Sequence, residues 1–271
     1  MGEIERGGLR LAYERRGEGP PVVFVSPLGW SGAHWRLHQV GALSGEFEVV
    51  TYDHRGTGSS SVADGPYSTR LLARDLLVLF EELDLLEPLR VVGLGSGGAV
   101  VQWLCLDQPA AVRAAVFVAS GPGQFDERPL ARDLPADGLA AVEEEWPAAL
   151  TRRLASREYF LDPAAPVVAP FVAAVTDGAA AAVAWRWHAE AARGHQLTEH
   201  IAEIEVPALV VVGEEDEVAP PGEPNPIESS LELAKRLFYA EYVEIPGAAH
   251  ALHVEQAEAF NASIRDFLTR Y

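Results

Sequence analysis

Residues 91–100 read Val-Val-Gly-Leu-Gly-Ser-Gly-Gly-Ala-Val, and this stretch is the most informative in the chain. It begins as a run of apolar β-branched residues, passes through four glycines and continues as small apolar residues. This pattern predicts a buried strand that turns sharply into a helix. Such a turn serves two kinds of site: it binds phosphate at the helix N-terminus, or it holds a catalytic side chain at the top of a sheet.

The phosphate-binding interpretation fits the chain poorly. Gly93, Gly95 and Gly98 match the dinucleotide fingerprint Gly-x-Gly-x-x-Gly. That fingerprint normally follows the first strand of its unit, whereas this turn follows about three predicted strands. The acidic residue expected at the end of the next strand is also missing, because residues 112–120 contain no carboxylate. The pattern therefore favours the catalytic turn.

Strands and helices alternate on both sides of this turn. Short apolar runs without polar alternation are typical of strands that are buried on both faces, and leucines at helical spacing follow at residues 69–86. This alternation predicts a mostly parallel sheet with helices on both faces. The predicted strands are 22–25, 48–52, 90–92, 115–118, 208–212 and 242–245, with helices at 69–86, from the turn to about 107, and from about 254 onward.

Residues 121–200 interrupt this alternation. They contain no strong strand pattern, and prolines divide them into Ala-, Glu- and Arg-rich helical stretches. We therefore expect a helical insertion between two strands of the sheet.

Composition narrows the possible partners. The chain of 271 residues has 40 acidic and 21 basic side chains, for a net charge of −19, and no basic cluster. Such a charge disfavours nucleic acid and anionic membrane surfaces and leaves a small molecule as the expected partner. The single cysteine, Cys105, lies among apolar residues and is expected in the core. The histidines are scattered without metal-ligand spacing, so neither a metal nor a cofactor is implied, and oligomeric state is left open.

The chain is expected to be a soluble cytoplasmic protein. The residues that follow Met1 lack the apolar core of a signal peptide. No apolar run approaches the roughly 20 residues of a membrane span. One cysteine cannot form an intrachain disulfide, which agrees with a reducing compartment.

Four motifs in order resemble the α/β-hydrolase superfamily, in its enol-lactonase and prolyl-aminopeptidase-like branch. They are the glycine turn, the loop at 53–59, the strand at 207–216 that ends in Asp216, and the loop at 245–250 that ends in His250. The resemblance covers nearly the whole chain. It implies an α/β-hydrolase fold, with a mostly parallel central sheet flanked by helices, a core of residues 1–120 and 201–271, and a helical cap of residues 121–200.

The glycine turn departs from the superfamily at one position. Members commonly read Val-Gly-x-Ser-x-Gly-Gly, and this alignment places Gly95 where the nucleophilic serine stands. A shift by one residue would make Ser96 the nucleophile, but Leu94 would then occupy a position that close helix–strand packing keeps small. Pro109, in the turn after the helix, also has the expected spacing in the unshifted alignment. We therefore interpret Gly95 as the nucleophile position without its serine.

The resemblance assigns roles to the remaining site residues. His250 is the expected general base, and Asp216 the carboxylate that orients it. The backbone N–H groups of Leu28 and Ser96 are the expected oxyanion-hole donors.

Other residues are candidates for the substrate pocket. The first loop carries Ser26 and Pro27 where members usually carry His-Gly, and Trp30 follows it. Trp185 and His188 lie in the predicted cap, whose inner face lines the pocket in this superfamily. An aromatic stripe at this spacing is also typical of a packed core, so both interpretations stay open.

The predicted function is general acid/base chemistry by a His250–Asp216 dyad without a serine nucleophile. Elimination, isomerisation, cyclisation or lyase chemistry on a small, largely apolar substrate would suit such a dyad. A first alternative is a hydrolase that uses water activated by His250, or Ser96 as nucleophile. A second is a non-catalytic ligand-binding protein or an inactivated serine-hydrolase variant.

Overall fold

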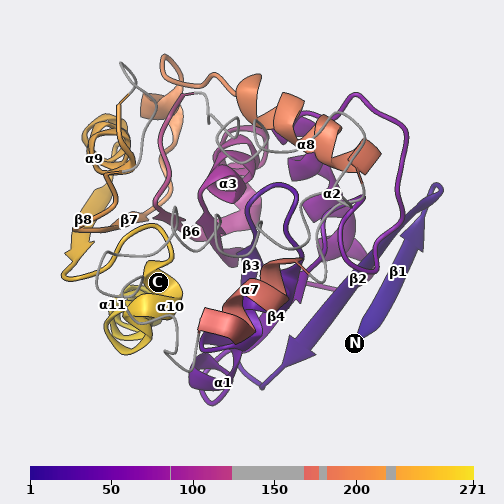
Figure 1. Ribbon diagram of the computed structural model, residues 1–271, viewed down its shortest axis with the longest axis horizontal. Coiled ribbons are helices and arrows are strands. Elements are labelled where there is room, and N and C mark those ends of the chain that lie inside the picture. The colour runs from indigo at the N-terminus through magenta and orange to yellow at the C-terminus, as the bar shows by residue number, and fades with distance from the viewer. Residues whose placement is uncertain (86, 124–167, 177–181, 218–223) are drawn as a thin grey trace.

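The structure is a computed structural model that describes residues 1–85, 87–123, 168–176, 182–217 and 224–271. Its described strands form one twisted sheet in the order β1-β2-β4-β3-β5-β6-β7-β8 (Figure 1). Strand β2 runs antiparallel to both neighbours, and strands β3 to β8 are mutually parallel. The strands are β1 (Gly2–Arg6), β2 (Leu9–Arg16), β3 (Pro21–Val25), β4 (Glu48–Tyr52), β5 (Leu89–Leu94), β6 (Val112–Val118), β7 (Ala208–Gly213) and β8 (Ala240–Ile245).

The central strands are mostly apolar because both faces of the sheet are covered; the charged residue of β5, Arg90, donates from its Nε to the Leu268 carbonyl at 2.8 Å. Every residue of β5 and β7 is buried, and so are four of the five residues of β3. Strand β8, at the edge, is mostly half-buried or exposed, and only its last residue, Ile245, is buried. The mostly parallel sheet and all six predicted strands are confirmed, with some ends extended by up to three residues.

The N-terminal hairpin of β1 and β2 is absent from the sequence prediction. Arg6 pairs with Leu9, so only Gly7 and Gly8 form the connection. Both glycines have positive φ, +59° and +83°, which the tight turn of a two-residue hairpin requires. A Gly-Gly pair between two alternating segments is a sequence signal for a hairpin, but these strands lack the continuous apolar runs on which the strand predictions rested.

Helices flank the sheet in two packed groups. Helix α1 packs with α11, and α2 packs with α3 (Figure 1). The predicted C-terminal helix is divided into α10 and α11, and α9 begins in a stretch without a predicted element, where Asn225 forms a capping box with Glu228. The helices are α1 (Gln39–Leu43), α2 (Thr69–Glu82), α3 (Ser96–Asp107), α7 (Val168–Thr176), α8 (Ala182–Arg193), α9 (Pro226–Arg236), α10 (Leu252–Glu255) and α11 (Ala257–Arg270), with short 3₁₀ turns at Gly32–Arg36, Pro109–Ala111 and Ile201–Glu203.

The strand order places two important loops side by side. Strands β3 and β5 are neighbours, but the chain leaves β3 toward β4 on one side and leaves β5 toward β6 on the other. Loops that diverge in this way open a crevice at the carboxyl ends of the strands. The loop with Leu28 follows β3 and the turn with Gly95 follows β5, so both meet at this crevice.

Parts of the predicted cap lie within the described residues. Helix α8 sits against core loops that have no side chain at the contact: a Cβ on Gly29 would lie 2.1 Å from Trp185, and one on Gly65 would lie 2.2 Å from Trp187. Residues 124–167 of the predicted cap are outside the described residues. The division into a core and a cap therefore stays a prediction.

Within the described ranges, every helix is too short or too polar to cross a membrane.

Candidate active site

Gly95 forms the corner between β5 and α3. Its backbone has φ +53° and ψ −123°, a conformation that costs any residue with a side chain some strain. Its N–H donates to the Val118 carbonyl at 2.8 Å, and its own carbonyl accepts from the Ser120 hydroxyl at 3.0 Å. These bonds to the neighbouring β6 strand and its end hold the corner in place.

The glycines of this turn differ in how much space a side chain would have at each position. A Cβ on Gly93 would lie 2.7 Å from the Gly98 Cα, and one on Gly97 would lie 2.5 Å from the Ser26 carbonyl oxygen. Both positions therefore exclude side chains. A Cβ on Gly95 would meet nothing closer than the His250 Nε2 atom, at 3.5 Å. Position 95 alone of these three has room for a side chain, and that side chain would face an imidazole.

The imidazole belongs to a histidine–carboxylate pair. His250 Nδ1 and Asp216 Oδ2 are 2.9 Å apart, and a carboxylate there selects the tautomer with the proton on Nδ1. Asp216 is buried, with 1% of its side chain exposed, whereas 23% of the His250 side chain is exposed. The loops after β7 and β8 that carry the pair are joined by the Glu215 N–H, which donates to the Ala248 carbonyl at 2.8 Å. The site thus brings together the sequence-predicted Gly95, Asp216 and His250.

The expected oxyanion donors have a different arrangement. The Leu28 N–H donates to the Ser96 Oγ atom at 2.9 Å, just after the turn at Gly95. Both residues are buried, with 2% and 1% of their surface exposed. The Leu28 amide is therefore already bonded to the Ser96 hydroxyl, which the sequence pattern did not indicate.

Ser26 and Pro27, in the first loop, are both buried. The Ser26 hydroxyl lies 3.1 Å from Trp35 Nε1, which donates to it, and 3.2 Å from the Ser31 carbonyl, to which it donates. The Pro27 carbonyl accepts from the Trp30 N–H at 3.1 Å. In this arrangement both residues shape the loop that carries Leu28.

A pair of buried histidines supports the same loop. His34 Nε2 lies 3.0 Å from the Ser26 Oγ atom, and His34 Nδ1 lies 3.0 Å from His253 Nε2. Burial lowers the pKa of His34 to about 3 and also lowers the pKa of His253, so both are neutral at pH 7. Sequence analysis missed His34, because a histidine within a short loop carries no periodic signal.

Aromatic side chains lie over the first loop. The Trp30 ring contacts the Phe171 ring of α7, with centroids 6.1 Å apart, and Phe171 also contacts His253 at 5.9 Å. Trp185 of α8 packs on Gly29. The sequence-predicted residues Trp30 and Trp185 therefore both lie close to the loop that carries Leu28.

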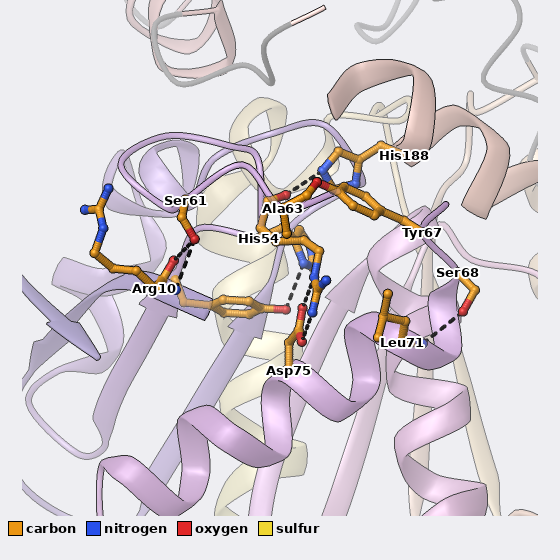
Figure 2. Close-up of polar contacts among 11 residues, drawn as sticks. Arg10, His54, Ser61, Ala63, Tyr67, Ser68, Leu71, Asp75 and His188 are labelled. Carbon is orange, nitrogen blue, oxygen red and sulfur yellow. Dashed lines mark hydrogen bonds and ion pairs between the residues drawn. The ribbon is translucent and has the colours of Figure 1, made fainter. Parts of the chain in front are cut away.

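His188 belongs to a separate buried group. Its Nε2 atom lies 2.9 Å from the Arg55 carbonyl, to which it donates, and its ring contacts those of His54 and Tyr67. Figure 2 shows His188 lying over His54 and Tyr67, with Asp75 of α2 below them. In this position His188 anchors α8 to the core, which favours the core interpretation for this residue.

The same group contains the organising residues of the 53–59 loop. The Arg55 guanidinium forms two bonds of 2.6 and 2.5 Å with the Asp75 carboxylate. His54 is buried with 1% exposure, and its Nε2 lies 2.9 Å from the Ser26 carbonyl, so it supports the first loop from below. Burial lowers the pKa of His54 to about 4 and that of His188 to about 3. The Arg55–Asp75 pair ties this loop to α2.

No group of three or more metal-ligating side chains occurs in the part of the chain that the structure describes. Cys105 is buried in α3, as expected, and burial raises the pKa of its thiol to about 12. The chemistry available at this site is therefore that of an imidazole, a carboxylate and hydrogen-bond donors.

Known proteins resemble this chain over most of its length. Residues 22–263 match the model of the alpha/beta hydrolase family. A Mycobacterium tuberculosis protein named as a non-heme bromoperoxidase, an assignment that its name marks as provisional, is 30% identical over 268 residues, which cover 96% of this chain and 97% of that protein.

Solved structures show the same fold. The enol-lactonase from Burkholderia xenovorans LB400 superposes with a TM-score of 0.82 at 26% identity, covering 99% of this chain and 100% of that one. A hydrolase from Pseudomonas aeruginosa PA01 superposes with a TM-score of 0.81 at 29% identity, covering 98% and 97% of the two chains.

Proposed function

This chain belongs to the alpha/beta hydrolase family, and from that premise we propose that it is an enzyme that works without a serine nucleophile. His250, oriented by Asp216, acts directly on the substrate as a general base and then as a general acid. Reactions of this kind are eliminations, isomerisations, cyclisations and bond cleavages that begin with a proton transfer. No cofactor is needed for the step.

One observation carries the proposal. The Nε2 atom of His250 lies 3.5 Å from the place where a Cβ on Gly95 would stand, and its Nδ1 atom is bonded to a buried carboxylate. The base and its orienting partner are therefore arranged as in a nucleophilic site, while the side chain that would attack the substrate is glycine. A proton of the substrate itself can take the place of the serine hydroxyl proton.

The neighbouring serine supports the proposal rather than replacing the nucleophile. Ser96 directs its hydroxyl to the Leu28 amide at 2.9 Å, whereas a side chain at position 95 would meet His250. A nucleophile must hydrogen-bond to its base, and this serine bonds to a backbone amide of another loop instead.

Hydrolysis by activated water is the second candidate. The named relatives include an enol-lactonase, and a water molecule held by His250 could attack a lactone or ester. This mechanism also uses the His250–Asp216 dyad and forms no covalent intermediate.

A fluorophosphonate probe tests the proposal, because it labels serines that an adjacent base activates. We expect intact-mass spectrometry to find the wild-type protein unlabelled after prolonged exposure. The Gly95→Ser variant shows in parallel that the probe reaches the site. An adduct that peptide mapping places on Ser96 of the wild-type protein would contradict the proposal and identify a serine hydrolase.

A further inference from the structure

The Ser96 hydroxyl has an unused hydrogen-bonding capacity. Its oxygen accepts the Leu28 N–H at 2.9 Å, which leaves its own proton and one lone pair. Among the described residues no acceptor takes that proton, although 99% of the residue is buried. A buried donor without an acceptor is costly, so this hydroxyl is suited to a ligand oxygen.

This donor lies beside the base. Ser96 follows Gly95 directly, at the first position of α3, and a side chain at Gly95 would meet the His250 Nε2 atom at 3.5 Å. The donor and the position that faces the base are thus consecutive residues of one turn. A carbonyl compound has an acidic carbon and an oxygen on either side of its carbonyl carbon, so the carbon can give up a proton while the oxygen gains negative charge.

The surroundings are suited to an uncharged molecule. The histidines nearby, His34 and His253, are neutral because burial lowers their pKa values. The guanidinium of Arg55 is paired with Asp75, and Asp216 faces His250. Aromatic rings of Trp30, Phe171 and Trp185 lie over the loop. The charges of Arg55 and Asp216 are therefore already paired within the protein, which suits an uncharged ligand.

We propose that the substrate is a neutral carbonyl compound with an acidic α-carbon, that His250 removes the α-proton, and that the Ser96 hydroxyl binds the carbonyl oxygen. This inference rests on the proposed function and names its substrate class. The C–H bond breaks and its proton moves to His250 Nε2. The electron pair forms a carbon–carbon double bond, and the carbonyl oxygen becomes an enolate oxygen that accepts from the Ser96 O–H.

The Leu28 amide acts through the hydroxyl in this arrangement. By donating to the Ser96 oxygen it polarises the O–H group, because hydrogen bonds in a chain strengthen one another. A hydroxyl placed in this way is worth more in the transition state, where the substrate oxygen carries charge, than in the ground state. Ser96 is thus a catalytic residue, and Leu28 is its positioning residue.

Isotope exchange at an α-carbon tests this directly, and 2-indanone is a suitable probe because it is small, apolar and uncharged. The protein is incubated with it in buffered D₂O, and the loss of α-proton signal is followed by proton NMR. We expect exchange well above that of the His250→Gln variant. Ser96→Ala should lower the rate by roughly 10²-fold, the size typical of losing one oxyanion donor.

Two further variants separate chemistry from folding. Ser96→Cys keeps the shape of the side chain but has a weaker donor, and it should fall between serine and alanine. Ser263→Ala removes an exposed hydroxyl that bonds only within α11, and it should exchange at the wild-type rate. Thermal unfolding of each variant shows whether it is folded at the assay temperature.

The outcomes distinguish this inference from the proposed function. Wild-type exchange no faster than that of His250→Gln would overturn the carbonyl substrate class. Ser96→Ala exchange equal to wild type would overturn the role of the hydroxyl and indicate that the Leu28 amide binds the oxygen itself. The proposed function fails independently, if the fluorophosphonate probe labels Ser96 in the wild-type protein.

Discussion

His250 and His253 lie three residues apart and have opposite environments. His250 bonds to the Asp216 carboxylate and keeps 23% of its side chain exposed. His253 is fully buried and bonds to another imidazole, that of His34, at 3.0 Å. A carboxylate stabilises a protonated imidazole, whereas a neutral imidazole in an apolar site disfavours it. The partner and the burial are therefore the reason why we propose proton transfer for His250, whereas His253 bonds to His34 and supports a loop.

The hydrogen bonds of the second histidine follow from its neighbours. The Ser26 hydroxyl donates to the Ser31 carbonyl, so His34 Nε2 must donate to the Ser26 oxygen. His34 Nδ1 then accepts, and His253 Nε2 donates to it. This series of hydrogen bonds joins α10, which follows the loop with His250, to the loop that carries Leu28. It can do so only while both rings stay neutral.

The largest expected effect comes from removing the carboxylate partner. Asp216→Asn in the Gly95→Ser background leaves His250 without its anion and can select the wrong tautomer. We expect the rate of fluorophosphonate labelling to fall by about 10³–10⁴-fold, as for triad aspartates generally. The rate is measured by intact mass over time, with Glu215→Gln, at the neighbouring residue, as the matched control. A labelling rate within threefold of the Gly95→Ser parent would contradict the assigned role of Asp216.

A smaller effect is expected at the histidine pair. His253→Phe keeps an aromatic ring but leaves His34 Nδ1 without a donor. We expect a loss of about 1–3 kcal/mol in the free energy of unfolding, which is the usual cost of an unsatisfied buried group. His253→Gln, which can donate from its amide, should lose less. Urea unfolding measures both, and equal losses would show that the hydrogen bond contributes nothing.

Per unit of pH, the smallest effect is the change in stability that one titrating histidine causes. Histidine titrates near pH 6.5 in the unfolded chain, whereas burial lowers the pKa of His188 to about 3 in the folded protein. Below pH 6.5 the unfolded chain therefore binds a proton that the folded chain does not. Stability falls as pH drops from about 6.5 toward 3, by up to about 1.4 kcal/mol per pH unit for each such histidine.

Urea unfolding at pH 7, 6 and 5 checks this dependence. His188→Gln keeps an amide donor for the Arg55 carbonyl and removes one titrating group, so its stability should depend less on pH than that of the wild type. Ser263→Ala removes an exposed hydroxyl that does not titrate and should keep the wild-type slope. Identical slopes for the wild-type protein and His188→Gln would mean that His188 binds its proton equally well in the folded and unfolded chains, which would contradict a lowered pKa.

Sequence reasoning succeeded where position along the chain determines structure. Buried strands carry continuous apolar runs. Close packing excludes side chains at Gly93 and Gly97, which leaves a glycine pattern that can be aligned with the superfamily motif. The pairing of His250 with Asp216 was implied by the resemblance of their two loops to superfamily motifs, and the structure brings the two side chains within 2.9 Å of each other. These features are local, and the parallel sheet brings them together in a fixed way.

The parts that sequence reasoning missed depend on side-chain direction. Nothing in the pattern indicated that the Ser96 hydroxyl would take the Leu28 amide, because that bond joins residues 68 positions apart. His34 and His253 are 219 positions apart, and their contact depends on how the first loop folds over α10. The bond from the Ser26 hydroxyl to the Ser31 carbonyl was likewise not predicted, and the place of Ser26 in the substrate pocket stays a prediction. Rotamers and long-range contacts of this kind leave no periodic signal.

The central claim is that position 95 faces a competent His–Asp dyad and lacks only its serine. The most direct measurement is the number of fluorophosphonate molecules bound per chain in the Gly95→Ser variant, with and without His250→Gln. We expect one adduct, mapped to residue 95, for Gly95→Ser. Almost none is expected for the variant that also carries His250→Gln, or for the wild-type protein. An unlabelled but folded Gly95→Ser protein, or equal labelling of the double variant, would contradict it.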